Sequence, residues 1–395
     1  MKYNFSDRMG NMESSSVREI LKATTIPNMI PFAAGNPDSD TFPVTEIQRI
    51  TTEILSENPI TALQYGVTEG YVPLRNEILK MLKRRCNLCC NDDSVIVTSG
   101  AQQVMDLVTK AICNYGDTVI CENPSFVGAL NCFRSYGCKI EGVPVESDGI
   151  NIEELENTIK KAHNPKLIYT IPNFHNPTGI TMSLEKRKAL YDIAKKYGLI
   201  ILEDNPYGDL RVSGENIPPI KSFDTDGIVV YAGSFSKILS PGIRIGYILA
   251  NKILNEKFAA GKQVSDVHSP ILTQMVAEQW MRECDLDGHI EKIQEIYRKK
   301  LNLMCDLIDS ELGDFVEYHR PEGGLFVWCK LPKNVNMVDF VKKGVENMVA
   351  VVPGNAFTAN FEDINCFRMN FSTPSNEKIV EGMKILGRVK DFYIG

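Results

Sequence analysis

The stretch YAGSFSKILSPGIRIGYILA, residues 231–250, sets a lysine between two apolar segments. The first segment runs into Ser234, Ser236 and Lys237, and the second begins directly after Arg244. Both segments are rich in residues that favour strands, and neither shows the regular polar alternation of a strand with one exposed face. The stretch therefore predicts two buried strands, with a lysine, two hydroxyl groups and an arginine gathered in the turn that joins them.

Apolar segments of the same kind recur upstream, each of them short and closed by turn residues. They are SVIVTSG (94–100), DTVICENPSF (117–126), KLIYTIPNF (166–174) and LIILEDNPYGDL (199–210). In each segment the polar residues come at the end of the apolar run or directly after it. Because ligands of open α/β sheets bind beyond the carboxyl ends of the strands, we expect these polar residues to form one site.

Amphipathic patterns between these segments predict helices. After residue 100, the apolar residues at 104, 107, 108, 111 and 112 follow the spacing of one helix face. The segment 183–198 has a similar pattern, with Ser183 as the expected N-cap and Gly198 as the expected C-terminal stop. Strands that alternate with helices predict an α/β domain with a mostly parallel sheet.

Beyond about residue 255 the pattern changes. A helix around 255–285 is expected to join the first region to a second one, which begins with a long helical stretch at 289–312 and ends with a helix at 375–393. Short β-like runs between them predict a smaller α+β region. A chain of 395 residues exceeds the usual size of one domain. We therefore predict an N-terminal segment at 1–45, a large domain at 46–275 and a small domain at 276–395.

Composition and charge argue against several classes of protein. The chain carries 43 basic and 50 acidic residues, a net charge of −7, whereas nucleic-acid binding requires a basic surface. No apolar run approaches the roughly 18 residues of a membrane span. The first residues, MKYNFSDRMGNMESSS, have no apolar core, so we expect no signal peptide and a cytoplasmic location.

The chain has eleven cysteines, and three of them, Cys86, Cys89 and Cys90, lie close together in RRCNLCCND. A structural zinc site needs four ligands, usually with a second pair at a set distance. The next cysteine is Cys113, and the five histidines show no paired spacing. We therefore expect reduced thiols rather than a metal site, and the sequence leaves the role of the cluster open.

Lys237 is the first candidate for chemistry. A lysine at a strand end among apolar residues loses solvation, which lowers its pKa and leaves more of the amine neutral. A neutral amine forms a Schiff base with a carbonyl group, and the neighbouring Ser234, Ser236 and Arg244 suit a phosphate. A carbonyl compound with a phosphate suggests pyridoxal 5′-phosphate (PLP). Taken alone, the stretch fits equally well with a solvated loop lysine beside serines that cap a turn.

The other strand ends favour the PLP interpretation. Asp204 closes a strand and could keep the pyridine nitrogen of PLP protonated, and Tyr207 follows three residues later. Asn176 lies in the turn of NFHNPTG, where its amide could bind the phenolic oxygen of the ring. Phe126 could stack on the ring. One expected helix start offers free backbone N–H groups to a phosphate, and its residues are Gly100, Ala101 and Gln102.

The chain resembles the fold-type I PLP-dependent aminotransferases of class I and II along essentially its whole length. The motifs that carry the resemblance follow the order of the family: GNPD, QYG, SGAQQ, NPSFVG, NFHNPTG, EDNPYGDL, SFSK with PGIRIGY, and FRMNFS. The subgroup that it looks most like contains the aromatic, 2-aminoadipate and kynurenine aminotransferases. The resemblance implies the aspartate aminotransferase-like α/β fold, with a large domain around a mostly parallel seven-stranded sheet and a smaller α+β domain.

The resemblance also implies a role for each residue around the cofactor ring. Lys237 would hold PLP as a Schiff base and carry a proton between substrate and cofactor. Asp204 would pair with the pyridinium nitrogen, while Asn176 and Tyr207 would bind the ring oxygen. Many relatives carry a tyrosine where this chain has Phe126, so stacking would survive here without the hydrogen bond of the hydroxyl group.

Further roles concern the phosphate, the substrate and the partner subunit. Arg368 would clamp the α-carboxylate of the substrate, and Gly35 would line the substrate pocket. The resemblance implies a homodimer with its active site at the subunit interface, where the N-terminal segment packs on the small domain and on the partner. Tyr65 would reach the phosphate from the partner subunit. The remaining phosphate contacts would come from Gly100, Ala101, Gln102, Ser234, Ser236 and Arg244.

The expected activity is transfer of an amino group from an L-amino acid to a 2-oxo acid such as 2-oxoglutarate, by a ping-pong mechanism. Aromatic, 2-aminoadipate-like and branched aliphatic donors all stay open. A C–S β-lyase would use the same lysine, aspartate and arginine, so the motifs do not exclude it. A PLP-sensing transcription regulator would need a DNA-binding module ahead of the fold, and GNPD already begins at residue 35. A decarboxylase or Claisen-type synthase fits NFHNPTG and FRMNFS less well.

Overall fold

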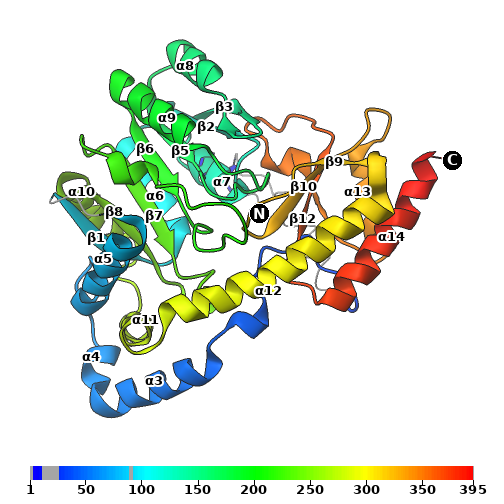
Figure 1. Cartoon of the computed structure of the whole chain (residues 1–395). Helices are drawn as coiled ribbons and strands as arrows, with labels where there is room; N and C mark the ends of the chain where they lie inside the picture. Colours follow the sequence, from blue (N-terminus) through cyan, green and yellow to red (C-terminus); the bar gives the residue numbers. More distant parts are fainter. Residues whose placement is uncertain (1–2, 11–25, 89–91, 395) are drawn as a thin grey trace.

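An eight-stranded sheet forms the centre of the computed structural model, which describes residues 3–10, 26–88 and 92–394 (Figure 1). The strands follow the order β1-β8-β7-β6-β5-β2-β3-β4. Their bounds are β1 Asp93–Thr98, β2 Thr118–Asn123, β3 Lys139–Glu146, β4 Gly149–Ile150, β5 Pro165–Thr170, β6 Ile200–Asp204, β7 Val229–Ser234 and β8 Gly246–Asn251. Six of them, all except β3 and β4, lie on the apolar segments that predicted strands, which confirms those segments.

The sheet is mostly parallel, as predicted. Strands β3, β2, β5, β6 and β7 run in one direction, whereas β8 is antiparallel to both β7 and β1. The sheet has one strand more than the seven expected, because the two-residue β4 turns back and pairs with the end of β3. The carboxyl ends of β5, β6 and β7 therefore meet at one edge.

Helices cover both faces of this sheet, as the alternation of side chains in β7 shows. Val230 and Ala232 pack on one face, with α6 Ala101–Ile112, α7 Val127–Ser135 and α10 Lys252–Gln263. Val229 packs on the other face with α8 Ile152–Lys161 and α9 Leu184–Tyr197, and Tyr231 packs there with α5 Val72–Cys86 and α11 Ile271–Glu283. Consecutive residues of one strand thus enter different layers.

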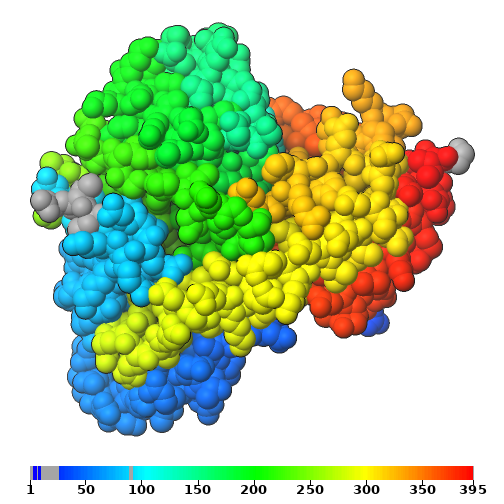
Figure 2. Space-filling model, viewed as in Figure 1, coloured from blue at the N-terminus to red at the C-terminus, as the bar shows by residue number. Residues whose placement is uncertain are grey.

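A four-stranded sheet forms the second region, in the order β11-β12-β10-β9. Its strands are β9 Glu317–Tyr318, β10 Phe326–Lys330, β11 Val352–Pro353 and β12 Cys366–Asn370, with α13 Met337–Glu346 and α14 Asn376–Ile394 beside them. The helix α12 Leu286–Leu307 runs from the first region to the second (Figure 1). Figure 2 shows it as part of a yellow band across this face of the molecule.

The expected helix around 255–285 is wrong in one respect, because α10 and α11 are separate helices. The chain leaves α10 at Gln263 and begins α11 at Ile271, with Pro270 at its N-cap. A proline inside a helix removes a backbone donor and clashes with the preceding turn, so one continuous helix could not run through residue 270. The long connection between the regions is made by α12 instead. The helix signals upstream are confirmed: Ser183 Oγ accepts from Lys186 N at 3.3 Å, and Gly198 ends α9 with a φ of 66°.

Residues 30–32 of the N-terminal segment are hydrogen-bonded to the second region. Ile30 N donates to Met348 O at 2.8 Å, and Asn370 N donates to Phe32 O at 2.7 Å. The segment continues into α3 Val44–Glu57 and α4 Pro59–Leu63, while α1 Asp7–Gly10 lies ahead of it. The domain limits at residues 45 and 275 stay a prediction. Within the described residues, no helix is long and apolar enough to cross a membrane.

Candidate active site

A cavity of about 330 Å³ lies where the carboxyl ends of β5, β6 and β7 meet the second region. Most of the predicted site residues line it, although they come from widely separated parts of the chain. Those that do so are Gly35, Ala101, Gln102, Phe126, Asn176, Asp204, Tyr207, Ser234, Ser236, Lys237, Arg244 and Arg368. Of the predicted set, Gly100 lies beside the cavity at the start of α6, and Tyr65 does not line it.

Lys237 follows β7 by three residues and brings an amine into the cavity. Its Nζ donates a hydrogen bond of 2.7 Å to the carbonyl oxygen of Gly35. Burial, together with the positive charges of Arg368 and Arg244, lowers the pKa of Lys237 to about 8. A substantial fraction of the amine is therefore neutral near physiological pH, as a nucleophile requires.

Asp204 is the last residue of β6 and is fully buried. The hydroxyl group of Tyr169 donates to its Oδ2 at 2.8 Å, whereas its Oδ1 has no hydrogen-bond partner among the described residues. The pKa of Asp204 is raised to about 7, chiefly by burial; the hydrogen bond from Tyr169 opposes this rise and the charge of Glu122 adds to it. A buried carboxylate oxygen without a donor is costly, so the site favours a ligand that supplies one.

Arg368 lies on β12 and closes the opposite wall of the cavity. Its Nη1 donates to Asn176 Oδ1 at 2.8 Å, and its Nη2 donates to Ala33 O at 3.0 Å. The guanidinium carbon lies 3.9 Å and 4.8 Å from the ring centroids of Phe326 and Phe357. Burial lowers the pKa of Arg368 to about 10, and its Nε has no hydrogen-bond partner within the described residues. This rigid cation suits a carboxylate.

The start of α6 and Arg244 form a cradle for an anion. Gly100 is the N-cap of α6 with a φ of 75°, and a Cβ at this position would collide with the guanidinium group of Arg244. Only glycine fits here. Arg244 Nη2 donates to Ser99 O at 3.2 Å, and Ser234 Oγ accepts from Ser236 N at 3.1 Å. Free N–H groups, hydroxyl groups and a guanidinium together suit a phosphate.

Tyr65 is the one candidate that the structure places elsewhere. It lies after α4, is 82% exposed, and its ring meets the ring of His268 edge-on at 5.8 Å. Its expected role depends on a partner subunit, so this stays a prediction. Phe126, by contrast, lines the cavity beside Gly128, whose carbonyl oxygen accepts from Gln102 Nε2 at 2.9 Å.

Several residues of the site were not predicted from the sequence. Tyr169 binds Asp204, and its position in β5, two residues before Ile171 on the same strand face, was an available signal. The apolar walls were not predictable from local sequence, because they come from distant segments. These wall residues are Ala33, Met105, Val127, Ile171, Phe326 and Phe357.

Of the cysteine cluster, the structure describes only Cys86, which does not line this cavity. Burial raises the pKa of the Cys86 thiol to about 12, which makes it a poor ligand and nucleophile. Cys89 and Cys90 lie outside the described residues. In the part of the chain that the structure describes, His, Cys, Asp and Glu form no group that could hold a metal ion.

Known proteins are similar to this chain in sequence and in fold. A sequence profile of the family described as aminotransferase class I and II matches residues 27–386. The aromatic-amino-acid aminotransferase 1 of Thermococcus litoralis is 39% identical over 386 residues, 97% of this chain and 93% of that protein. The 2-aminoadipate transaminase of Thermus thermophilus is 35% identical over 97% of this chain and 96% of its own length.

Solved structures agree with the sequence comparison. The crystal structure of Pyrococcus horikoshii kynurenine aminotransferase has a TM-score of 0.95 and 36% identity, covering 98% of this chain and 97% of that one. A single mutant of Thermus thermophilus aspartate aminotransferase, only 21% identical, has a TM-score of 0.87 over 98% of this chain and 100% of its own. The latter shows the fold alone, and it confirms the predicted aspartate aminotransferase-like architecture.

Proposed function

The chain belongs to the class I and II aminotransferases, and from this we propose that the cavity around Lys237 binds PLP and moves amino groups from L-amino acids to 2-oxo acids. One observation carries the proposal. An amine with a pKa of about 8 and a buried carboxylate with an unpaired oxygen line the same cavity of about 330 Å³. The amine and the carboxylate are the two groups that PLP chemistry requires.

The residues present fit the cofactor. Asp204 Oδ1, which has no donor among the described residues, would accept the N–H of the pyridine ring. The cradle of Gly100, the start of α6 and Arg244 would hold the phosphate, and the amide of Asn176 and the hydroxyl group of Tyr207 would hold the ring oxygen. Phe126 would cover the ring face. When bound, PLP supplies an aldehyde that a neutral amine can attack and a protonated ring that withdraws electrons.

The remaining residues act on the substrate. Arg368 would bind the α-carboxylate, because its guanidinium group is held rigidly and faces the cavity. Lys237 Nζ would take the proton from the substrate Cα, in keeping with its lowered pKa. We propose a ping-pong order, in which the first 2-oxo acid leaves before the acceptor binds. The named relatives make aromatic and 2-aminoadipate-like donors the first candidates, with 2-oxoglutarate as the acceptor and branched aliphatic donors open.

We also propose that the active unit is a homodimer in the cytoplasm. Exposed apolar side chains gather at 60–67 and at the neighbouring 264–268, where Gly66 N donates to His268 Nε2 at 3.2 Å. They include Ile60, Leu63, Tyr65 and Val264, each more than 70% exposed. Such a patch is costly in water and suits a subunit interface. The described cysteines are all free, as a reducing compartment favours.

The activity is tested by mixing PLP-loaded protein with a panel of L-amino acids in the absence of any 2-oxo acid. We expect absorbance to report conversion of the cofactor to its amine form. Mass spectrometry should identify the 2-oxo acid product, released in an amount of one equivalent per active site. Subsequent addition of 2-oxoglutarate should restore the original spectrum. Pyruvate and ammonia released from a cysteine conjugate, with the cofactor spectrum unchanged, would mean a C–S β-lyase and contradict the proposal.

The dimer is tested by complementation. If Tyr65 acts in the site of the partner, mixed dimers of Lys237→Ala and Tyr65→Ala subunits contain one site with both changes and one site with neither. Activity should then rise when the two inactive proteins are mixed and allowed to exchange subunits. If Tyr65 acts within its own subunit, every site of the mixture is defective and no activity returns.

A further inference from the structure

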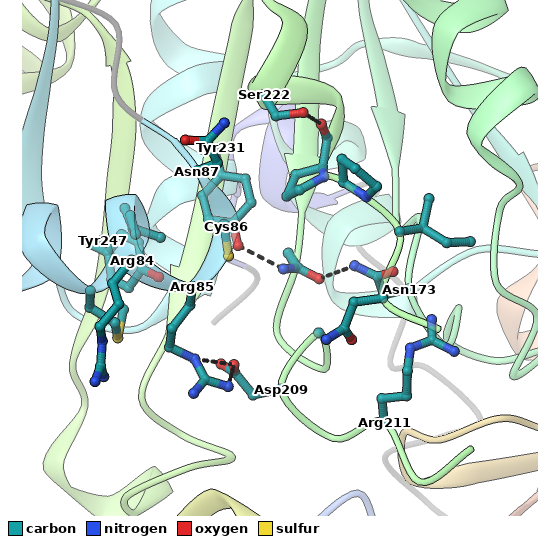
Figure 3. Close-up of a pocket in the computed structure, with 18 of the residues that line it drawn as sticks. Arg84, Arg85, Cys86, Asn87, Asn173, Asp209, Arg211, Ser222, Tyr231 and Tyr247 are labelled. Atoms are coloured by element: carbon teal, nitrogen blue, oxygen red, sulfur yellow. Dashed lines mark hydrogen bonds and ion pairs between the residues drawn. The ribbon is translucent and has the colours of Figure 1, made fainter. Parts of the chain in front are cut away.

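A second cavity lies directly behind the loop that follows β6 (Figure 3). It has a volume of about 440 Å³ and lies between the end of α5, this loop and the side chains of Tyr231 and Tyr247. We call it the back cavity, and the cavity around Lys237 the front cavity. Residues of this loop line both cavities. The front cavity is lined by Asp204, Pro206 and Tyr207, and the back cavity by Asn205, Gly208 and Asp209.

Four side chains form a continuous chain of hydrogen bonds; Asn173, Asn205 and Tyr231 line the back cavity, and Arg187 is buried beside them. Arg187 Nη2 donates to Asn173 Oδ1 at 2.6 Å, and Asn173 Nδ2 donates to Asn205 Oδ1 at 2.8 Å. Asn205 Nδ2 then donates to Tyr231 Oη at 2.6 Å. Figure 3 shows the last two bonds as dashed lines between the labelled Asn173 and Tyr231. The chain ties the loop after β5 and the loop after β6 to strand β7.

Arg187 determines the direction of every bond in this chain. It lies on α9 with no exposed surface, and a guanidinium group can only donate. Asn173 must therefore present its oxygen to Arg187 and its NH₂ group to Asn205. Asn205 must in turn accept with its oxygen, which leaves its NH₂ group for the hydroxyl of Tyr231. The other bonds of Arg187 hold it in place, through the carbonyl oxygens of Pro172, Met182, Ile217 and Pro218.

The residues of this hydrogen-bond chain are sequence neighbours of residues that line the front cavity. Asn205 directly follows Asp204 and precedes Tyr207 by two residues, and Asn173 precedes Asn176 by three. In the front cavity the side chains of Asn176, Asp204 and Tyr207 must hold their positions to within a fraction of an ångström. The loops that carry them are joined to each other from behind by the Asn173–Asn205 bond.

We propose that Asn173 and Asn205 are positioning residues for the cofactor, which hold Asn176, Asp204 and Tyr207 in register through the bond between them and its anchor on Arg187. This inference rests on the proposed function of the front cavity. It assigns the back cavity the role of a structural support, whose polar wall acts on a site that it does not touch.

The first test compares Asn205→Ala with Asn216→Ala. Asn216 also lines the back cavity, but its side chain has no hydrogen bond to any residue that the structure describes, so it is a matched control. We expect Asn205→Ala to raise the dissociation constant of PLP for the apo-protein about tenfold, since two hydrogen bonds are lost. We expect it to lower kcat by about 10- to 100-fold, with KM for the amino donor changed by less than about threefold. Asn216→Ala should change neither by more than about twofold.

The second test reverses the direction of the two hydrogen bonds made by Asn205 without removing either of them. In Asn173→Asp, the carboxylate accepts from Arg187 and from a rotated Asn205 amide, whose oxygen then accepts from the hydroxyl group of Tyr231. Asn173→Asp should therefore stay within about threefold of the wild type in PLP affinity, whereas Asn173→Ala should weaken it about tenfold. Urea unfolding of each variant confirms that the folded proteins are being compared.

The inference is overturned if Asn205→Ala behaves as Asn216→Ala does, or if Asn173→Asp is as weak as Asn173→Ala. Its failure is distinguishable from failure of the proposed function. If the wild-type protein binds PLP but converts none of the amino acids, the proposed activity is wrong, and the PLP affinities of the variants still decide the inference.

Discussion

The front and back cavities lie on opposite sides of one loop, and the back cavity is the larger, at about 440 Å³ against about 330 Å³. The two cavities differ in whether the charged side chains that line them have partners. The arginines of the back cavity are all paired: Arg84 with Asp287, Arg85 with Asp209 and Asp287, and Arg211 with Glu322. In the front cavity, Asp204 Oδ1 and Arg368 Nε are buried without a partner among the described residues.

In this molecule, buried charged groups without an ionic partner mark the reactive site better than the volume of a cavity does. Paired charges in the back cavity are already stabilised, so a ligand there would have to displace a partner. In the front cavity the pKa of Lys237 falls to about 8 and that of Asp204 rises to about 7, because the protein does not compensate their burial. Perturbed pKa values of this kind gather at functional sites.

The largest effect should follow Lys237→Ala in the front cavity. Without the amine, the site loses both its nucleophile and its base, and we expect kcat to fall by at least about 10³-fold. Single-turnover absorbance with the preferred donor measures the loss. The arginine of the phosphate cradle remains, so the variant should still bind PLP, though reversibly. A variant with more than a tenth of the wild-type rate would place the chemistry elsewhere.

Asp204→Asn should lower kcat about 10²-fold, because an amide does not hold a proton on the pyridine nitrogen. The same change should stabilise the apo-protein. Since burial raises the pKa of Asp204 from 3.8 to about 7, ionisation costs stability, and this cost grows as the pH rises from about 4 through 7. At pH 8 the apo-variant should therefore melt a few degrees above the apo-wild type, and at pH 4 the two should coincide. Equal melting temperatures at pH 8 would refute this.

The capture of PLP by the apo-protein should depend on pH with a midpoint near 8, the pKa of Lys237. The neutral amine is the reactive form, so the rate should rise nearly 100-fold between pH 6 and pH 9 and then level off. Stopped-flow absorbance measures this rate. A rate that still rises tenfold per pH unit above 9 would show an ordinary, solvated lysine.

Tyr169→Phe removes the donor from Asp204 Oδ2 and should have a smaller effect. The pKa of the carboxyl group should rise further, since the bond from Tyr169 lowers it. We expect the affinity for PLP to fall about tenfold, comparable to the loss of one hydrogen bond to a charged group. Equilibrium titration of the apo-protein measures it, and Tyr191→Phe, a change on the opposite face of the sheet, serves as the control.

The smallest effect should follow Arg85→Gln in the back cavity. This change removes ion pairs with Asp209 and Asp287, and because the side chains are 23%, 34% and 43% exposed, solvent screening limits their value. We expect the free energy of unfolding in urea to fall by about 1 kcal/mol or less. The kcat should stay unchanged. A large loss of kcat without loss of stability would mean that the back cavity takes part in the reaction.

Local sequence predicted the elements well where one signal dominated. The buried strands β1, β2, β5, β6, β7 and β8 were recognisable as apolar runs, and Ser183 and Gly198 marked the ends of α9. The strand β3 was not predicted, because its buried and exposed residues are interspersed and KIEGVPVE has no continuous apolar run. The break between α10 and α11 was not predicted, because residues with helical patterns lie on both sides of the connection that contains Pro270.

Local sequence was enough to predict which chemical groups end the strands, and the order of the motifs identified the family. The chemical properties of those groups, in contrast, depend on the folded structure. Arg368 meets Asn176 across 192 residues of sequence, and Lys237 meets Gly35 across 202. A pKa depends on burial and on neighbouring charges, and both arise when distant segments pack together. The same holds for the bond between Asn173 and Asn205, because two loops must first lie side by side before one can support the other.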